Sequence, residues 1–258
     1  MGALDGRHAL VTGGGSGIGA AIARVLAAEG AAVTVAGRRR AAIDAVVAKL
    51  PRAAAVVADV TREIDCAGMA QAARAAFGAI DIVVANAGAA ESAPISQLDL
   101  GHWQRMLDVN MTGAFLSVKA ALGDVGRRDG APAGGGRIVF IASTAGLKGY
   151  PYVAAYCAAK HGVIGLARAL AVELATRDVT VNAVCPGFTE TELLDQSIAR
   201  IVAKTGRSAE AARLELARAN PQGRFVTAEE VALTVLWLCT PGASAITGQA
   251  ISVSGGEV

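Results

Sequence analysis

Short aliphatic runs alternate along the chain with longer segments in which apolar positions recur at helical spacing. The aliphatic runs end at glycine or polar residues, which favours buried strands over short buried helices. They predict seven strands, at residues 8–12, 32–37, 54–59, 80–88, 137–143, 179–187 and 251–256. The segments between them predict helices at residues 17–29, 39–50, 62–77, 97–125, 153–177 and 228–239. Such alternation is typical of an α/β fold with a doubly wound, seven-stranded parallel sheet flanked by helices.

The chain shows no internal break with the composition of a linker, so residues 1–258 are predicted to form a single domain. Two segments exceed the usual length of a loop. The first, residues 126–137, reads GRRDGAPAGGGR. The second, around residues 188–226, contains helical patterning. It predicts a small helical flap, because long excursions in compact domains often act as lids.

The composition narrows the class of protein. Hydrophobic residues make up 53% of the chain and aromatic residues 4%, and the 31 glycines suit helices packed closely on a parallel sheet. The formal charge of +2 and the scattered basic residues argue against a nucleic-acid partner. Four distant cysteines without CxxC spacing argue against a zinc site or a disulfide framework, and no metal is predicted. Residues 1–8 lack a signal sequence, and no apolar run reaches the roughly 20 residues of a membrane span, which predicts a cytoplasmic protein without membrane contact.

The sequence TGGGSGIG at residues 12–19 follows the first predicted strand and opens the first predicted helix. Its glycines allow a tight turn and a close approach of the backbone, so that a pyrophosphate can bind the N–H groups at the helix N-terminus. A purely structural turn is the alternative, but the position at the first strand–helix junction favours a Rossmann-like dinucleotide site. The candidate cofactor contacts in this loop are Gly13, Gly15, Ser16, Gly17, Ile18 and Gly19.

The residues after the second predicted strand bear on the choice of dinucleotide. A site for NAD usually has an acidic residue there, which binds the ribose 2′-hydroxyl. This chain instead has three arginines at residues 38–40, with no carboxylate between Glu29 and Asp44. Arg38 can pair with the 2′-phosphate of NADP through its planar guanidinium. We therefore expect NADP as the preferred cofactor and NAD as the second choice; a charge run facing water at a helix start is the alternative interpretation.

A tyrosine and a lysine stand four residues apart in the small-residue segment AAYCAAKHGVIGL, residues 154–166. Residues i and i+4 share one face of a helix, so Tyr156 and Lys160 are neighbours. The ordinary phenol pKa near 10 is too high for efficient proton transfer at neutral pH, and the cation, helped by a positively charged cofactor ring, is expected to lower it to about 7. Chance pairing of a tyrosine and a lysine at this spacing is common.

A catalytic role for the pair is favoured by Ser143 at the end of the fifth predicted strand, where a hydroxyl can donate to a developing oxyanion. Asn110 is an amide amid apolar residues and needs hydrogen-bond partners, of which bound water is one candidate.

In combination, these motifs resemble those of the short-chain dehydrogenase/reductase family over essentially the whole chain. The matching features are TGGGSGIG, Asp59 after the third predicted strand, NAG at residues 86–88, Asn110, Ser143, YxxxK at residues 156–160 and PGFTET at residues 186–191. The resemblance implies that Tyr156 is the general acid/base and that Ser143 orients the carbonyl. It also implies that Lys160 holds the nicotinamide ribose and lowers the pKa of Tyr156, and that Asn110 supports a water-mediated proton relay.

The same resemblance implies further cofactor contacts and an assembly. Asp59 is expected to contact the adenine, Asn86 to lie beside the cofactor, and Thr189 to reach the carboxamide. The implied contacts are Asp59, Val60, Asn86, Ala87, Gly88, Tyr156, Lys160, Pro186, Gly187 and Thr189. A homotetramer, or else a dimer, is implied, joined through the two long helices that carry Asn110 and Tyr156.

The implied reaction is reversible hydride transfer between the nicotinamide and a carbonyl or secondary alcohol. Within the family, the resemblance points to 3-oxoacyl-thioester reductases and 3-hydroxyacyl-CoA dehydrogenases. One alternative is a relative that acts on a sugar, steroid or aromatic alcohol. The other is a non-catalytic NAD(P) sensor, against which the intact Ser143, Tyr156 and Lys160 argue. Arg127 and Arg128 either contact a carrier or CoA phosphate or face water.

Overall fold

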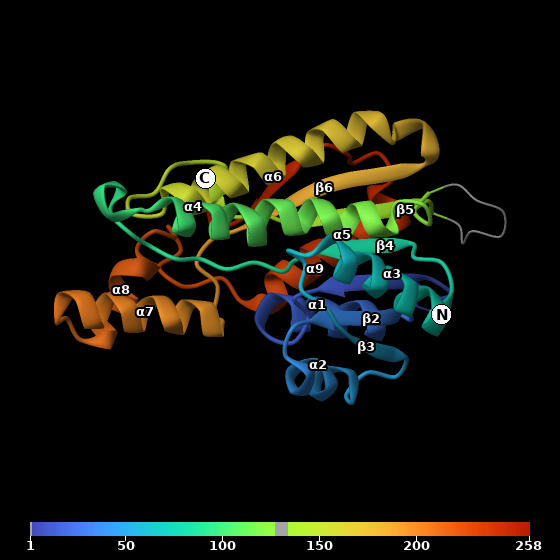
Figure 1. The fold of residues 1–258 in the computed structure, drawn as a ribbon, viewed down its shortest axis with the longest axis horizontal. Coiled ribbons are helices and arrows are strands. Elements are labelled where there is room, and N and C mark those ends of the chain that lie inside the picture. The colour runs from blue at the N-terminus through green and yellow to red at the C-terminus, as the bar shows by residue number, and fades with distance from the viewer. Residues whose placement is uncertain (1, 127–133) are drawn as a thin grey trace.

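The aliphatic runs pair into a parallel sheet in this computed structural model, which describes residues 2–126 and 134–258 (Figure 1). Within these residues the strands are β1 (His8–Thr12), β2 (Ala32–Gly37), β3 (Ala53–Val57), β4 (Ile82–Ala85), β5 (Gly136–Ile141), β6 (Val179–Pro186) and β7 (Ala250–Val253). Their order, β3-β2-β1-β4-β5-β6-β7, confirms the predicted seven-stranded doubly wound sheet. Arg127 and Arg128 lie outside the described residues.

Two central strands end earlier than the aliphatic pattern predicts. The fourth strand spans Ile82–Ala85 in place of residues 80–88, and the fifth ends at Ile141 in place of residue 143. The residues that follow each strand leave the ladder at the carboxyl edge of the sheet. In an open parallel sheet this edge carries the ligand-binding loops, so the early ends place Ser143 and the NAG motif where a ligand binds.

Helices cover both faces of the sheet (Figure 1). They include α1 (Gly17–Ala28), α2 (Arg40–Val47), α3 (Glu63–Phe77), α6 (Ala154–Glu173) and α9 (Ala228–Cys239). Neighbouring residues of β1 point to opposite faces: Leu10 packs into the core with residues of α3 and α6, whereas Ala9 and Val11 pack with residues of α1, α2 and α9. Within the described residues, no helix is both long and apolar enough to cross a membrane.

The long helix predicted at residues 97–125 is interrupted. The structure has α4 (Leu100–Leu107), a π-helical turn (Asp108–Thr112) and α5 (Gly113–Ala121). Asn110 lies in the π-helical turn, and its side-chain Nδ2 donates to the carbonyl oxygen of Met106 at 3.0 Å. Because this carbonyl is the one that the backbone N–H of residue 110 would bind in an α-helix, the side chain competes with the helical ladder and favours the local bulge.

The helical patterning in residues 188–226 is confirmed by α7 (Glu192–Thr205) and α8 (Ala209–Ala217). Both project beyond the sheet layers at one end of the molecule (Figure 1). They enclose a small apolar cluster of their own, made of Leu194, Ile198, Ala212, Ala217 and Phe225. A backbone bridge between Thr189 and Val226 joins the two ends of the segment. We call residues 188–226 the flap.

Candidate active site

The glycine loop between β1 and α1 packs directly against the loop after β4. Gly13 and Gly17 adopt φ angles of +64° and +52°, in the left-handed region that favours glycine. A Cβ atom on Gly13 would lie 2.7 Å from the Cα of Ala87. The Asn86 amide Nδ2 donates to the carbonyl oxygens of Thr12 at 2.9 Å and Gly13 at 3.1 Å. Asn86 thus fixes the shape of the loop, a role that its position in the sequence did not reveal.

Thr12 is a further site residue that sequence analysis missed. Its buried hydroxyl accepts hydrogen bonds from the backbone N–H of Asn86 at 3.1 Å and Ala87 at 3.2 Å. It also donates to the carbonyl oxygen of Val84 at 3.4 Å. Thr12 therefore joins the ends of β1 and β4, where the strand order of the sheet reverses. A polar residue at the end of an aliphatic strand was the signal that could have identified it.

The start of α1 fits the pyrophosphate of a dinucleotide. Ser16 is the N-cap residue, but its side chain makes no capping hydrogen bond, and the first turn contains no acidic residue. The N–H groups of that turn therefore remain available to an anion. The loop residues that line the adjoining cavity are Gly13, Ser16, Gly17, Ile18 and Gly19. Gly15 is absent from this lining and packs against Ala42 of α2 instead.

Two of the arginines after β2 have different partners. Arg39 Nη2 lies 3.4 Å from Ser16 Oγ and 3.3 Å from Glu192 Oε2, so this side chain rests between the glycine loop and α7. Arg40 pairs with Asp44 along α2 at 2.7 Å. Besides Arg38, which the sequence predicts, Arg39 is therefore a second candidate for contact with a 2′-phosphate.

Arg38 itself is exposed and forms a charged cluster with Asp59, at the ends of β2 and β3. Burial acts to raise the pKa of Asp59. Hydrogen bonds from the backbone N–H and hydroxyl of Thr61, together with the charges of Arg38 and Arg62, outweigh burial and lower it. Val60 is buried. These three predicted cofactor contacts, Arg38, Asp59 and Val60, lie outside the lining of the cavity beside the glycine loop.

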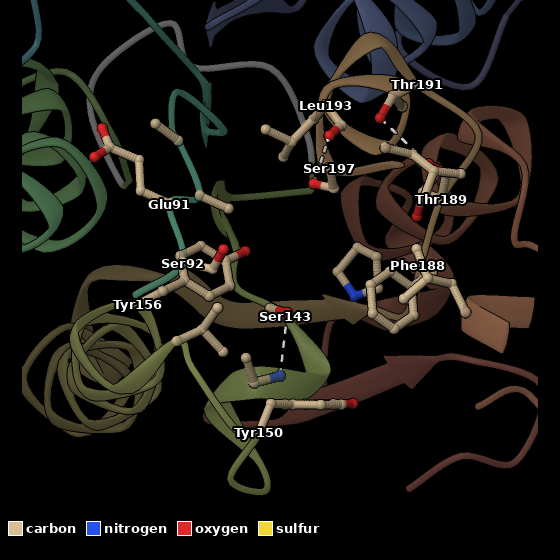
Figure 2. A pocket seen from close by; sticks show the side chains of 18 of the residues that line it. Glu91, Ser92, Ser143, Tyr150, Tyr156, Phe188, Thr189, Thr191, Leu193 and Ser197 are labelled. Atoms are coloured by element: carbon tan, nitrogen blue, oxygen red, sulfur yellow. Dashed lines mark hydrogen bonds between the residues drawn. The ribbon is translucent and has the colours of Figure 1, made fainter. Parts of the chain in front are cut away.

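A cavity of about 1000 Å³ brings the four predicted catalytic residues together. Tyr156 and Lys160 come from α6, Ser143 follows β5, and Asn110 belongs to the π-helical turn. Figure 2 shows Tyr156 and Ser143 near the centre of this cavity. The Ser143 hydroxyl oxygen accepts a hydrogen bond from the Ala145 N–H at 3.1 Å, so its own proton points to another acceptor. The predicted cofactor residues Asn86, Ala87, Gly88, Pro186, Gly187 and Thr189 line the same cavity.

Burial governs the ionisation of the Tyr156–Lys160 pair. Lys160 is only 4% exposed, and its Nζ donates to the carbonyl oxygen of Ile141 at 2.8 Å and lies 5.6 Å from the centre of the Tyr156 ring. Burial lowers the pKa of Lys160 to about 8. Burial also raises the pKa of Tyr156 to about 12, against the opposing effect of a hydrogen bond with Ser143. In the protein alone, desolvation of the phenol therefore sets the direction of the shift. The lowering expected from Lys160 together with a positively charged cofactor ring stays a prediction.

The buried Asn110 amide is satisfied by the backbone. Its Nδ2 donates to the carbonyl oxygens of Ala89 at 2.8 Å and Met106 at 3.0 Å, and its Oδ1 accepts from the Ala89 N–H at 3.3 Å. A Cβ atom on Gly88 would lie 2.8 Å from Asn110 Oδ1 and 3.6 Å from Lys160 Nζ. Asn110 therefore clamps the segment after β4, and the bare Gly88 leaves room for the amide beside the lysine.

A hydrogen-bonded network behind Ser143 connects the cavity to the end of the chain. Tyr150 Oη donates its proton to the Glu257 carboxylate and lies 2.7 Å from Thr144 Oγ1, within hydrogen-bond distance of that hydroxyl. Lys148 Nζ pairs with Glu257 at 3.2 Å, and the Glu257 side chain is almost fully buried. The Tyr150 ring meets the ring of Phe188 edge to face at 6.4 Å between centres (Figure 2). Since Tyr150 and Glu257 are 107 residues apart, no local pattern could have predicted this contact.

Comparison with known proteins assigns the family. The family described as short chain dehydrogenase matches residues 7–201. The chain therefore belongs to the short-chain dehydrogenase/reductase family, as its motifs indicated. It is an enzyme of that family, an NAD(P)-dependent oxidoreductase that acts on a carbonyl or alcohol group.

Its relatives match along almost the entire chain. D-beta-hydroxybutyrate dehydrogenase of Cupriavidus necator is 36% identical over 262 residues, which cover 99% of both chains. Cis-4-hydroxycyclohexanecarboxylate dehydrogenase of Sinomonas cyclohexanicum is 39% identical over 254 residues, which cover 97% of this chain and 96% of the relative. The crystal structure of a variant actinorhodin polyketide ketoreductase with NADPH has a TM-score of 0.90 at 36% identity and covers 97% of both chains.

Proposed function

We propose that this enzyme interconverts a 3-oxoacyl group and the corresponding 3-hydroxyacyl group, as a 3-oxoacyl-thioester reductase or a 3-hydroxyacyl-CoA dehydrogenase. The observation that carries the proposal is the convergence of Ser143, Tyr156 and Lys160 on one cavity that also contains the glycine loop. The relatives support the substrate class, since one is named for beta-hydroxybutyrate and another for polyketide keto reduction.

The roles of the protein residues follow from their chemistry. The bound dinucleotide would supply or accept the hydride. Ser143 donates its hydroxyl proton to the substrate carbonyl oxygen, on which negative charge develops during reduction. With a pKa of about 12, Tyr156 stays protonated at neutral pH and gives its proton to the more basic alkoxide as it forms. In the direction of oxidation, the Tyr156 phenolate accepts the proton of the alcohol.

Lys160 and Asn110 support this proton transfer. Lys160, with a pKa of about 8, exchanges protons near neutral pH, and its charge stabilises the phenolate that Tyr156 becomes. Its position beside the ring also suits contact with the nicotinamide ribose. Asn110 holds the segment after β4 through Ala89. Its part in a water-mediated proton relay toward Lys160 is proposed from the resemblance to the family.

The test of this function is Tyr156→Phe, which removes the hydroxyl and keeps the ring. We expect the variant to bind NADPH as the wild type does and to lose about 100-fold or more in kcat, the usual contribution of a general acid. NADPH fluorescence titration measures the binding, and consumption of NADPH with acetoacetyl-CoA measures the turnover. Unchanged turnover would show that another group transfers the proton.

We further propose a preference for NADP, supported by Arg38 and Arg39 and by the absence of acidic residues at residues 38–43. Arg38→Asp and Arg39→Asp should each raise the KM for NADPH far more than that for NADH, because the new carboxylate repels a 2′-phosphate. Arg40→Asp is the control, because the arginine that it replaces pairs with Asp44 along α2. Equal losses with both cofactors would contradict the preference.

Residues 1–258 are proposed to form one domain in which the flap closes over the substrate. A homotetramer, or else a dimer, joined through α4, α5 and α6 is also proposed. Exposed apolar side chains on these helices, Leu100, Phe115 and Val172, support such an interface. Light scattering during gel filtration measures the assembly.

The buried and unpaired thiols of all four cysteines support a cytoplasmic location.

A further inference from the structure

Two basic side chains of α7 reach across the cavity to the segment after β4. Arg200 Nη1 donates to the carbonyl oxygen of Ala90 at 2.8 Å, and Lys204 Nζ donates to that of Ser92 at 3.4 Å. Both side chains line the cavity, as does Ser197. Positions i, i+3 and i+7 lie on one side of a helix. This face of α7 therefore presents two positive charges to the space between the flap and the segment after β4.

The acidic side chains that line the same cavity already have cationic partners. Within residues 2–126 and 134–258, the pairs are Glu91 with Arg105 (3.5 Å), Glu192 with Arg39 (3.3 Å), and Glu215 with Arg207. In the same part of the chain, Arg200 and Lys204 have backbone carbonyl groups as partners and no carboxylate. Arg200 is partly buried, and one carbonyl oxygen engages only one of its five N–H donors. The cavity thus contains positive charge that the described side chains do not neutralise.

This charge lies far from the pyrophosphate end of the cavity. Glu192, at the start of α7, pairs with Arg39 beside the glycine loop. Arg200 follows Glu192 by eight residues, about 12 Å along the helix axis, and Lys204 is one turn farther. An anion bound by Arg200 and Lys204 therefore belongs to the substrate and not to the dinucleotide phosphates.

We propose that Arg200 and Lys204 form a recognition site for an anionic oxygen group on the substrate, at the end remote from the reacting carbonyl. This inference rests on the proposed oxidoreductase function and names the class of its substrate. The anion is either a carboxylate of the substrate itself or a phosphate of a thioester carrier. Both groups present oxygen atoms. A guanidinium binds such oxygen atoms through two parallel N–H groups, and an ammonium binds them as a point charge. A partly buried arginine is suited to this, because its interactions are screened less than those at an open surface.

The test compares charged and neutral forms of the same ketone. The panel contains acetoacetyl-CoA with its N-acetylcysteamine thioester, acetoacetate with its ethyl ester, and a cyclic 4-oxo carboxylate with its methyl ester. For each pair, kcat/KM is measured for the wild type, Arg200→Gln and Lys204→Gln. Arg218→Gln is the control, since it removes the same charge from an exposed position of the flap outside the cavity lining. Circular dichroism and NADPH binding confirm that each variant is folded.

We expect Arg200→Gln to lower kcat/KM for the charged form about 10- to 100-fold, the size of a charge-assisted hydrogen bond, mainly through KM. Lys204→Gln should cause a smaller loss, and the neutral forms should change less than about threefold. A loss confined to acetoacetyl-CoA assigns the anion to the carrier phosphate, and a loss confined to the free acids assigns it to a carboxylate. Equal losses for charged and neutral forms, or equal losses in Arg218→Gln, would overturn the proposal. If the wild type reduces only the cyclic 4-oxo carboxylate and its methyl ester, the proposed 3-oxoacyl function is wrong. The comparison of that acid with its ester still tests the anion site.

Discussion

Replacing Lys160 by methionine is predicted to stabilise the protein while it removes activity. Lys160 is buried, and its ammonium has one hydrogen bond, to the Ile141 carbonyl. Methionine has a similar length and no charge, so Lys160→Met keeps the packing and eliminates the desolvated ion. In the proposed function this charge binds the nicotinamide ribose and stabilises the Tyr156 phenolate, so the buried ammonium serves the reaction at a cost to the stability of the fold.

The size of the effect follows from the pKa of Lys160. Burial lowers this pKa from 10.5 to about 8. At about 1.4 kcal/mol per unit, a difference of about 2.5 units corresponds to roughly 3 kcal/mol of free energy spent on keeping the ammonium buried. Loss of the hydrogen bond to Ile141 offsets about 1 kcal/mol of the gain. The net expectation is a stabilisation of about 2 kcal/mol, or about 4–8 °C in Tm for a protein of this size.

The pH dependence gives this prediction its sharpest test. The destabilisation by the buried ammonium is complete below the folded-state pKa of about 8 and disappears as the pH rises through the unfolded-state value of 10.5. The Tm advantage of Lys160→Met should therefore be largest at neutral pH and shrink toward pH 10.5.

Calorimetry at several pH values measures the Tm advantage, and Lys49→Met, at an exposed position, is the control, with an expected change within about 0.5 kcal/mol. A Lys160→Met variant that melts at or below the wild-type temperature at pH 7, with a gap independent of pH, would refute the reasoning.

Two further predictions concern the glycine loop and the start of α9. Gly19→Ala places a Cβ atom against the Gly13 carbonyl oxygen and Asn86 Nδ2, where a backbone group cannot move aside. It should destabilise the protein by about 1–3 kcal/mol and weaken NADPH binding, as thermal melts and fluorescence titration will show; normal binding would contradict the packing argument. Glu230 completes a capping box with Thr227 and bonds Arg224, and these contacts lower its pKa to about 2. Glu230→Gln should therefore cost about 1 kcal/mol at neutral pH, and in urea melts the difference should fade as the pH drops from 4.5 toward 2. A difference that persists at acid pH would argue against the charge as its cause.

Features that depend on neighbours in the chain could be predicted from the sequence. The apolar runs and the glycine or polar residues that close them identified the strands, because buried parallel strands consist almost entirely of aliphatic residues. The glycine loop was recognisable because a tight turn before a helix constrains residues next to each other. The i, i+4 pairing of Tyr156 with Lys160 is likewise a property of the helix itself.

Other features arise from contacts between distant segments, and no local pattern indicates them. The hydrogen bonds of Thr12 join β1 to the residues after β4, and Tyr150 meets Glu257 at the end of the chain. Arg200 contacts the Ala90 carbonyl oxygen only because the flap folds back over the segment after β4. In the predicted helix at residues 97–125, the side chain of Asn110 competes for a backbone carbonyl and breaks the regular period.

The sequence by itself determined the type of fold and predicted the dinucleotide loop and the reacting side chains, because periodicity and motif spacing are local properties of the chain. Only the tertiary structure decided how those side chains ionise. Helical spacing places an ammonium beside the phenol and suggests a lowered pKa, but the desolvation that raises the pKa of Tyr156 and lowers that of Lys160 depends on everything packed around them. Burial is a property of the whole fold, and it sets the direction in which the pKa of each group in this pair shifts.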